Sequence, residues 1–245
     1  ITIEEGEVSA IKAVDGTEDD NISVSGESSL WKVELSHDTY KLARTVIYAT
    51  GSHHRHLGIK EEEQFIGKGV SYCAVCDGAF FKDKSVIVAG GGNSALGDAL
   101  YLSDICADVY IVHRRDEFRG DAVTLEKLRS CDNVHIVTGV TIQALKGEKK
   151  LEEVVLSDGS VIKANGLFVA IGMEPETDIL KGVVKLDNTG YVVAGEDCVT
   201  SAKGLFVAGD VRTKELRQVI TAAADGAIAA TSAVNYVNEL GIKSI

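Results

Sequence analysis

Apolar and polar residues alternate along the first 50 positions of the chain, as in Ile1-Thr2-Ile3 and again over residues 31–35. A period of two places successive side chains on opposite faces of an extended strand. Turn residues separate these segments, and the acidic and Ser/Gly-rich stretch over residues 18–29 is typical of a solvated hairpin tip. We therefore expect a β-meander over residues 1–50, with its first strand starting at Ile1.

A different pattern follows the charged and irregular segment 52–64, which we interpret as a domain boundary. The apolar run 85–89 leads into three glycines, a helical stretch over 94–103 and a second apolar run over 109–112. A strand, a glycine turn, a helix and a strand within about 30 residues form a βαβ unit, which predicts a parallel sheet. Further strands are expected at 134–138, 153–156 and 167–171, and Pro175 should turn the chain out of the sheet.

The last segment repeats an earlier theme. Residues 204–210 resemble residues 166–172 and, more loosely, 46–51, because each is an apolar strand that ends at a glycine. Residues 218–237 then form an Ala-rich stretch that predicts a long helix. Its small side chains would allow close packing against a sheet or a neighbouring chain.

Composition narrows the functional classes. The chain has 245 residues, 45% of them hydrophobic, and a formal net charge of −12, so its overall field repels nucleic acid and anionic lipid. No apolar run approaches the roughly 20 residues that cross a bilayer. Five cysteines do not make a disulfide scaffold in a chain of this size, which favours a cytoplasmic protein. The chain starts with Ile rather than Met, and we expect it to be a fragment.

A glycine-rich turn lies between the first apolar run and its helix. Gly90 would permit a tight turn, Gly92 would let a pyrophosphate approach the backbone, and Ala95 would let helix and strand pack closely. Asn93 and Ser94 stand at the helix N-terminus, where phosphates bind. The alternative is a glycine turn without a ligand, but the flanking strand and helix favour a dinucleotide site.

The next strand ends in a basic cluster formed by His113, Arg114, Arg115 and Arg119. An NAD site places an acidic residue there for the ribose 2′-hydroxyl, whereas arginines make charge-assisted bonds to a 2′-phosphate. The cluster predicts NADPH rather than NADH. A solvated basic patch is the alternative, and it is less favoured in a chain of net negative charge.

Cys73 and Cys76 are separated by two residues, a spacing that suits either a small disulfide ring or half of a zinc site. No second Cys-x-x-Cys or His pair stands at suitable spacing, so a redox role is favoured. Asp77 could pass a proton during thiol–disulfide exchange, or it could cap the following turn. The other cysteines are expected to be buried small hydrophobic residues: Cys106, Cys131 and Cys198.

Two weaker signals lie near the C-terminus. The pair Gly209 and Asp210 could bind a ribityl or ribose hydroxyl, and the helix start at Arg217, Gln218 and Val219 could place backbone N–H groups beside a flavin. Taken alone, each is more often a helix cap or a surface turn than a cofactor contact.

Together these motifs resemble the low-molecular-weight, NADPH-dependent thioredoxin reductases, which are flavoproteins. The resemblance rests on their order and spacing: Ala49-Thr50-Gly51, Cys73 to Gly78, Gly90 to Ala95, His113-Arg114-Arg115 with Arg119, Ala170-Ile171-Gly172, Gly209-Asp210 and Arg217-Gln218. It implies that Thr50, Gly51, Ile171 and Gly172 also belong to cofactor sites. The first glycine-rich loop of that family, which grips the FAD pyrophosphate, is absent from this sequence.

The resemblance implies an α/β fold with two Rossmann-like dinucleotide-binding domains. The FAD domain, incomplete here, would comprise residues 1–54 and 173–245, and the NADPH domain with the cysteine pair would comprise residues 55–172. A homodimer and a rotation of the inserted domain are also implied. Electrons would pass from NADPH through FAD and the cysteine pair to a thioredoxin-like protein. The alternatives are an NADPH-binding module without turnover and the flavoprotein subunit of a peroxide-reducing system. Which cysteine faces the flavin stays open.

Overall fold

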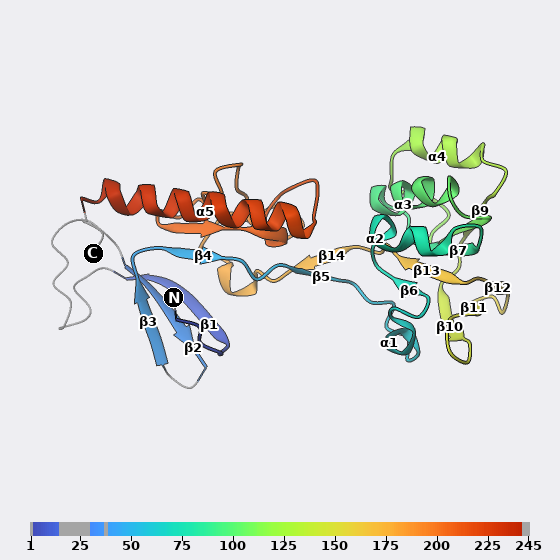
Figure 1. Ribbon diagram of the computed structural model, residues 1–245, viewed down its shortest axis with the longest axis horizontal. Helices are drawn as coiled ribbons and strands as arrows, with labels where there is room; N and C mark the ends of the chain where they lie inside the picture. The colour runs from blue at the N-terminus through green and yellow to red at the C-terminus, as the bar shows by residue number, and fades with distance from the viewer. Residues whose placement is uncertain (1, 15–29, 37–38, 242–245) are drawn as a thin grey trace. The chain divides into compact units, whose positions relative to one another are not determined.

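The chain consists of two compact units, one inserted in the sequence of the other (Figure 1). The computed structural model describes residues 2–14, 30–36 and 39–241. Unit 1 comprises Ile1–His53 and Glu174–Ile245, and unit 2 comprises His54–Met173. These limits lie one residue from the domain boundaries expected at 54/55 and 172/173.

The N-terminal part of unit 1 is an antiparallel meander of three strands, as the alternating pattern predicts. The strands β1 (Val8–Val14), β2 (Leu30–Leu35) and β3 (Thr39–Ala43) pair in that order. The expectation that the first strand starts at Ile1 is wrong, because the β1–β2 ladder begins at the pair Val8 and Leu35 and residues 2–7 are exposed. Ile1 itself and the expected hairpin tip at 18–29 lie outside the described residues.

The rest of unit 1 packs a helix on a short parallel pair of strands. Strand β4 (Val46–Tyr48) pairs with β15 (Leu205–Val207), and helix α5 (Val219–Glu239) covers them. Ala229 and Ala233 are buried against Phe206, which shows how the small residues of the helix permit close packing. Two 3₁₀ turns complete the unit, η2 (Asp178–Leu180) and η3 (Gly209–Val211).

Unit 2 is built on a parallel five-stranded sheet, as the βαβ pattern predicts. Its order is β6 (Val70–Ser71), β13 (Gly166–Val169), β7 (Ser85–Ala89), β8 (Asp108–His113) and β9 (Val134–Thr138). Helices α3 (Asn93–Ser103) and α4 (Ala122–Arg129) cover one face. Alternate residues of the buried strands face the two sides, so Val86 and Val88 contact the helices whereas Ile87 and Ala89 face the opposite way.

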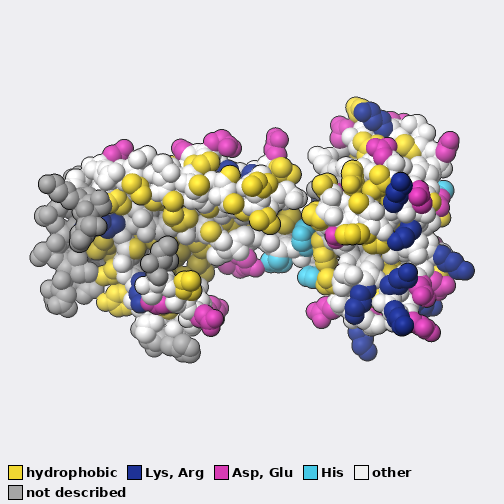
Figure 2. Space-filling model, in the orientation of Figure 1, with side chains coloured by type: hydrophobic (Ala, Val, Ile, Leu, Met, Phe, Trp, Pro, Cys, Tyr) yellow, Lys and Arg dark blue, Asp and Glu magenta, His cyan; other side chains and the backbone are white. Residues whose placement is uncertain are grey.

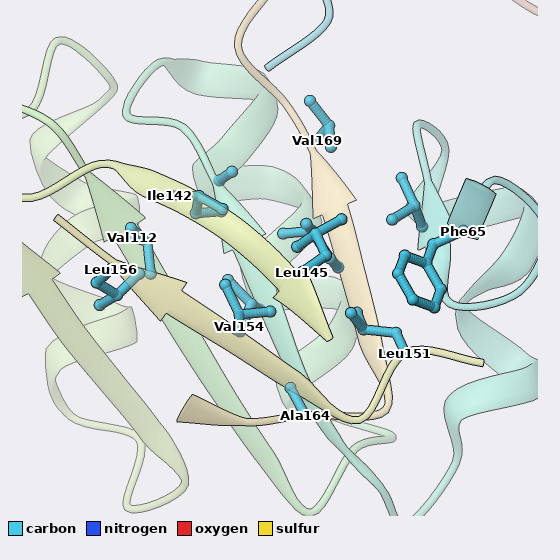
Figure 3. Packing of buried hydrophobic residues seen from close by; sticks show 13 residues of the cluster. Phe65, Val112, Ile142, Leu145, Leu151, Val154, Leu156, Ala164 and Val169 are labelled. Carbon is cyan, nitrogen blue, oxygen red and sulfur yellow. The ribbon is translucent and has the colours of Figure 1, made fainter. Parts of the chain in front are cut away.

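An antiparallel sheet covers that opposite face. It consists of β10 (Ile142–Lys146), β11 (Glu153–Leu156) and β12 (Val161–Lys163), whose buried side chains join those of the parallel sheet in one cluster (Figure 3). Residues 153–156 were predicted as a strand, and they are one, but they belong to this second sheet. Their apolar pattern does not reveal which sheet they join.

Short elements fill the segment that was read as irregular. Residues 52–64 contain strand β5 (Ser52–His54) and the start of helix α1 (Glu62–Phe65). Pro175 does not turn the chain but ends strand β14 (Met173–Pro175), which pairs with β5 alone, and an edge position tolerates proline. Helix α2 (Ala74–Asp77) and the 3₁₀ turn η1 (Gly78–Phe81) follow β6. None of the described helices is long and apolar enough to cross a membrane.

Candidate functional site

The glycine turn of unit 2 borders a pocket of about 390 Å³ at the carboxyl ends of β7, β8 and β13. A side chain at Gly90 would collide with the Ala170 carbonyl and lie 2.7 Å from the Ala95 methyl group, which explains the close packing of turn and helix. At Gly92 the same position is open, with no atom within 4 Å. The pocket is lined by nine of the residues that the sequence singled out: Gly90, Gly92, Asn93, Ser94, His113, Arg114, Arg119, Ile171 and Gly172.

Backbone hydrogen bonds hold the basic segment beside this turn. The amides of Arg119 and Gly120 donate to the Gly91 carbonyl at 2.8 and 3.1 Å. The side chains of Arg114, Arg115 and Arg119 are exposed, and all but Arg115 line the pocket. The segment therefore presents cationic groups at the pocket rim.

His113 has a distinct environment within this cluster. Its ring is buried, lies on Phe118 with ring centroids 5.0 Å apart, and fills the space over Gly91. Burial lowers the pKa of His113, and the charges of nearby arginines lower it further, so the ring is neutral at pH 7. Its Nε2 is buried and has no hydrogen-bond partner among the described residues. Such an orphaned atom points to a bound group.

Sequence reasoning missed part of the pocket wall. Arg55, Leu57 and residues 140–142 also line it. Arg55 lies in a segment interpreted only as a boundary, and its side chain passes 3.6 Å from the position that a Cβ on Gly172 would take. No motif marks these residues, because the fold alone brings them to the glycine turn.

The two cysteines predicted to act together are bonded to one another. Cys73 and Cys76 form a disulfide, so neither is available to a metal in this form. Cys73 is the N-cap of α2, and its Sγ accepts the Cys76 amide at 3.2 Å. Cys76 is exposed and Cys73 is half-buried, so the pair is open to a reaction partner.

Asp77 does not cap the turn that follows it. It stands at the N-cap position of η1 without a side-chain cap hydrogen bond, because its carboxylate is used elsewhere. The buried Ser71 hydroxyl donates to Asp77 Oδ2 at 2.6 Å and accepts the Cys73 amide at 3.1 Å. The capping alternative is thus wrong, and Asp77 is linked to the cysteine pair through Ser71.

The three remaining cysteines are free thiols, and two of them are buried as expected. Burial raises the pKa of Cys106 to about 11, so that thiol is inert. Cys131 is wrongly predicted to be buried. It is partly exposed at the end of α4, where its Sγ donates to the Lys127 carbonyl at 3.3 Å.

The weaker candidates of unit 1 meet at one edge of the β4–β15 pair, the edge formed by the carboxyl ends of the two strands. Because these strands are parallel, Thr50 and Gly51 leave β4 beside Gly209 and Asp210, which follow β15. The helix start adds Arg217, whose Nε contacts the Asp210 carbonyl at 3.5 Å. Gln218 follows as the N-cap of α5 and forms a reciprocal capping box with Thr221. Val219 is the first residue of the helix. Asp210 Oδ1 is buried without a partner among the described residues.

A buried ion cluster that sequence reasoning missed fixes this edge. The Asp225 carboxylate accepts hydrogen bonds at 2.8 to 2.9 Å from the Gly209 amide, from Nε and Nη2 of Arg212, and from Lys214 Nζ. These bonds, those from Arg212 first, hold the pKa of Asp225 well below its usual range. The cluster anchors the turn that carries Asp210.

Comparison with known proteins places these features in a family. Residues 9–226 match the profile of the pyridine nucleotide-disulphide oxidoreductases. A thioredoxin reductase of Mycolicibacterium smegmatis is 39% identical over 89% of the chain and 71% of its own length. A thioredoxin reductase of Treponema pallidum is 42% identical, but the chain spans only 66% of it.

Solved structures agree with this assignment. The thioredoxin reductase of Streptococcus pyogenes superposes with a TM-score of 0.82 at 34% identity, over 96% of this chain and 74% of that one. The thioredoxin reductase of Giardia duodenalis gives the same TM-score at 33% identity. The chain belongs to the pyridine nucleotide-disulphide oxidoreductase family, in its low-molecular-weight thioredoxin reductase group.

Proposed function

We propose that the protein is a thioredoxin-disulfide reductase, which passes electrons from NADPH through FAD and the Cys73–Cys76 pair to a disulfide of a thioredoxin-like protein. The observation that carries this proposal is the Cys73–Cys76 disulfide, exposed at Cys76, in the same unit as a glycine-turn pocket with an arginine rim. The chain spans about two thirds of the length of the curated relatives that it matches.

The pocket of unit 2 fits the nucleotide. The open position at Gly92 and the start of α3 suit a pyrophosphate, since backbone N–H groups at a helix N-terminus bind phosphate. Arg114 and Arg119 at the rim suit a 2′-phosphate. The unpaired Nε2 of His113 leaves one further polar contact for the ligand. Ile171 and Gly172 would border the same nucleotide.

The edge of β4 and β15 fits the flavin. Thr50, Gly51, Gly209 and Asp210 stand at the carboxyl ends of parallel strands, where open α/β sheets bind cofactors. The buried and unpartnered Asp210 oxygen is a ready acceptor for a ribityl hydroxyl. Arg217, Gln218 and Val219 would border the isoalloxazine ring. FAD, when bound, takes the hydride of NADPH and supplies the two electrons that open the disulfide.

The cysteine pair would then carry the electrons out. Reduction breaks the S–S bond and needs two electrons and two protons. One thiolate then attacks the partner's disulfide, which forms a mixed disulfide and releases one partner thiol. Attack by the second cysteine on the mixed disulfide restores the Cys73–Cys76 bond and releases the other partner thiol. The Cys76 amide that donates to Cys73 Sγ would stabilise a thiolate at Cys73. We assign the proton transfer to Asp77, which is tied to the Cys73 amide through Ser71.

Two further features are consistent with a cytoplasmic homodimer. Three of the five cysteines are free thiols, as expected in a reducing compartment. Hydrophobic side chains gather over α5 on the face that Figure 2 shows. Val219, Ile220 and Val234 of this helix are strongly exposed. A second copy of the chain would remove such side chains from water.

A single spectroscopic experiment tests the proposed function. The protein is supplied with FAD, freed of excess flavin, and reduced anaerobically with NADPH before a thioredoxin disulfide is added. We expect a flavin absorption band that NADPH bleaches and the disulfide restores. A colourless protein that still binds NADPH would instead show a nucleotide-binding module without turnover, and restoration by a peroxide-reducing partner alone would favour the other alternative.

A further inference from the structure

The residue before the redox disulfide is held by a buried carboxylate. The Tyr72 hydroxyl donates to Glu62 Oε1 at 2.8 Å, and Glu62 is only 2% exposed. The same carboxylate accepts the backbone amides of Leu57 and Gly58 at 3.0 and 3.1 Å. Glu62 is therefore fixed by the backbone, and it fixes Tyr72 in turn.

Two histidines complete the enclosure of Tyr72. The His54 ring stacks on the tyrosine ring with centroids 5.1 Å apart, and the His56 ring meets it edge-on at 5.4 Å. His56 Nδ1 lies 2.9 Å from the Tyr72 hydroxyl oxygen. Because the single hydroxyl proton goes to Glu62, His56 Nδ1 must carry the proton of its own contact. Burial and the bond to Glu62 raise the pKa of Tyr72, so its hydroxyl remains a donor at neutral pH.

The chain on either side of Tyr72 is also restrained. The Ser71 hydroxyl accepts the Cys73 amide, and strand β6 joins the parallel sheet at Val70 and Ser71. The backbone that leads to Cys73 is thus anchored at Ser71 by the sheet and at Tyr72 by Glu62. Nothing in the sequence links Glu62 to this segment, because ten residues and a change of element separate Glu62 from Tyr72.

We propose that the Tyr72–Glu62 hydrogen bond is a positioning device that keeps Cys73 beside Cys76 after reduction and so favours the disulfide over the dithiol. The proposal rests on the proposed redox function of the pair. When the S–S bond breaks, the two sulfurs are free to separate, and closing the ring again costs conformational entropy. An anchored Cys73 backbone loses less conformational entropy when the ring closes. The disulfide is therefore favoured, and the reduction potential of the Cys73–Cys76 pair is lower. Tyr72 and Glu62 act through Cys73, because neither of them forms a hydrogen bond with a sulfur atom in the described part of the chain.

The test is a redox equilibrium with glutathione at pH 7, in which two glutathione thiols become one glutathione disulfide for each protein disulfide reduced. Tyr72→Phe removes only the hydroxyl. We expect it to lower the equilibrium constant for disulfide formation by about three- to tenfold, where tenfold corresponds to about 30 mV. Thiol alkylation after acid quenching, read by mass spectrometry, measures the reduced fraction without any need for flavin.

The matched control is Tyr48→Phe in unit 1. Tyr48 is buried, whereas Tyr72 is half-buried, and the Tyr48 hydroxyl donates to the Glu176 carbonyl at 2.6 Å, so the variant loses the same chemical group and the hydrogen bond that it donates. It should lower the free energy of unfolding about as much as Tyr72→Phe but leave the cysteine equilibrium unchanged. Glu62→Gln should shift the thiol–disulfide equilibrium in the same direction as Tyr72→Phe, provided that circular dichroism shows the variant to be folded.

The outcomes distinguish the positioning role of Tyr72 from the redox function of the cysteine pair. An equilibrium constant that Tyr72→Phe leaves at the parent value, or that Tyr48→Phe shifts equally, overturns the positioning role alone. A parent pair that does not exchange with glutathione contradicts the proposed redox function and, with it, this inference. A shift confined to Tyr72→Phe and Glu62→Gln supports both.

Discussion

The Ser71 hydroxyl donates to the Asp77 carboxylate at 2.6 Å while accepting the amide of Cys73, so one buried side chain connects the acidic group to the redox disulfide. A hydroxyl between a carboxylate and a cysteine backbone holds the carboxylate in place. This contact removes Asp77 from the capping role and leaves it available for proton transfer.

Asp77→Asn should therefore slow thiol–disulfide turnover by about 10²- to 10⁴-fold, the usual span for one acid–base group. Asparagine keeps the acceptor for Ser71 but cannot release a proton. Steady-state reduction of a thioredoxin disulfide across pH 6–9 measures the effect, and NADPH affinity should not change. A variant as fast as the parent over this range would remove Asp77 from the mechanism.

Removing the two arginines at the pocket rim should discriminate between nucleotides. Arg114→Ala with Arg119→Ala loses charge-assisted phosphate bonds worth roughly 1.5–3 kcal/mol each. NADPH binding should weaken by orders of magnitude, whereas NADH has no 2′-phosphate to lose. Arg129→Ala is the control, since Arg129 is an exposed arginine of α4 that pairs with Glu126 away from the pocket. Equal weakening of NADPH and NADH in a titration would refute the 2′-phosphate assignment.

The Asp225 cluster makes a prediction about acid stability. The pKa of Asp225 is lowered in the folded state. Its contribution to the free energy of unfolding is therefore fully present above the ordinary pKa of 3.8 and is lost as the pH falls below that value. Asp225→Ala leaves Arg212 and Lys214 buried without their partner and should cost about 3–5 kcal/mol at pH 7. The cost should shrink toward pH 3. Urea unfolding of the variant and of Asp178→Asn, whose ion pair with Lys181 is exposed, compares the two environments. A cost independent of pH would contradict the electrostatic explanation.

Asp98 on α3 should behave in the opposite sense. Burial raises its pKa to about 6, so ionisation destabilises the fold as the pH rises through the interval from 3.8 to about 6. Asp98→Asn should thus raise the free energy of unfolding by about 1–3 kcal/mol at pH 8. It should have little effect at pH 4, where the carboxyl is protonated. The exposed Asp132→Asn serves as the control, and a gain of equal size at both pH values would show that burial is not the cause.

The sequence was informative where chemistry and pattern coincide within a short segment. The strand over 85–89, the glycine turn and the helix after it are adjacent, so the βαβ unit and half of its pocket could be predicted. A buried parallel strand is a continuous apolar run, and the turn that follows needs glycine for steric reasons that the structure shows at Gly90.

What could not be predicted depends on contacts between distant segments. No motif marks Asp225, because its partners Arg212 and Lys214 lie in another segment of the chain. Glu62 and Arg55 were placed in a boundary for the same reason. Strand 153–156 has the length and apolar character of its neighbours, and only the register with β10 and β12 assigns it to the antiparallel sheet.

In the proposed function, electrons pass from the flavin to the protein disulfide only through the Cys73–Cys76 pair. Stopped-flow absorbance of the flavin band in FAD-loaded Cys73→Ser and Cys76→Ser variants tests this most directly. In the first series each variant is mixed with NADPH, and in a second series thioredoxin disulfide is also present. We predict that NADPH bleaches the flavin in both variants as it does in the parent, while reoxidation by thioredoxin disulfide is lost. Thioredoxin disulfide that still reoxidises the flavin in either serine variant would contradict the claim.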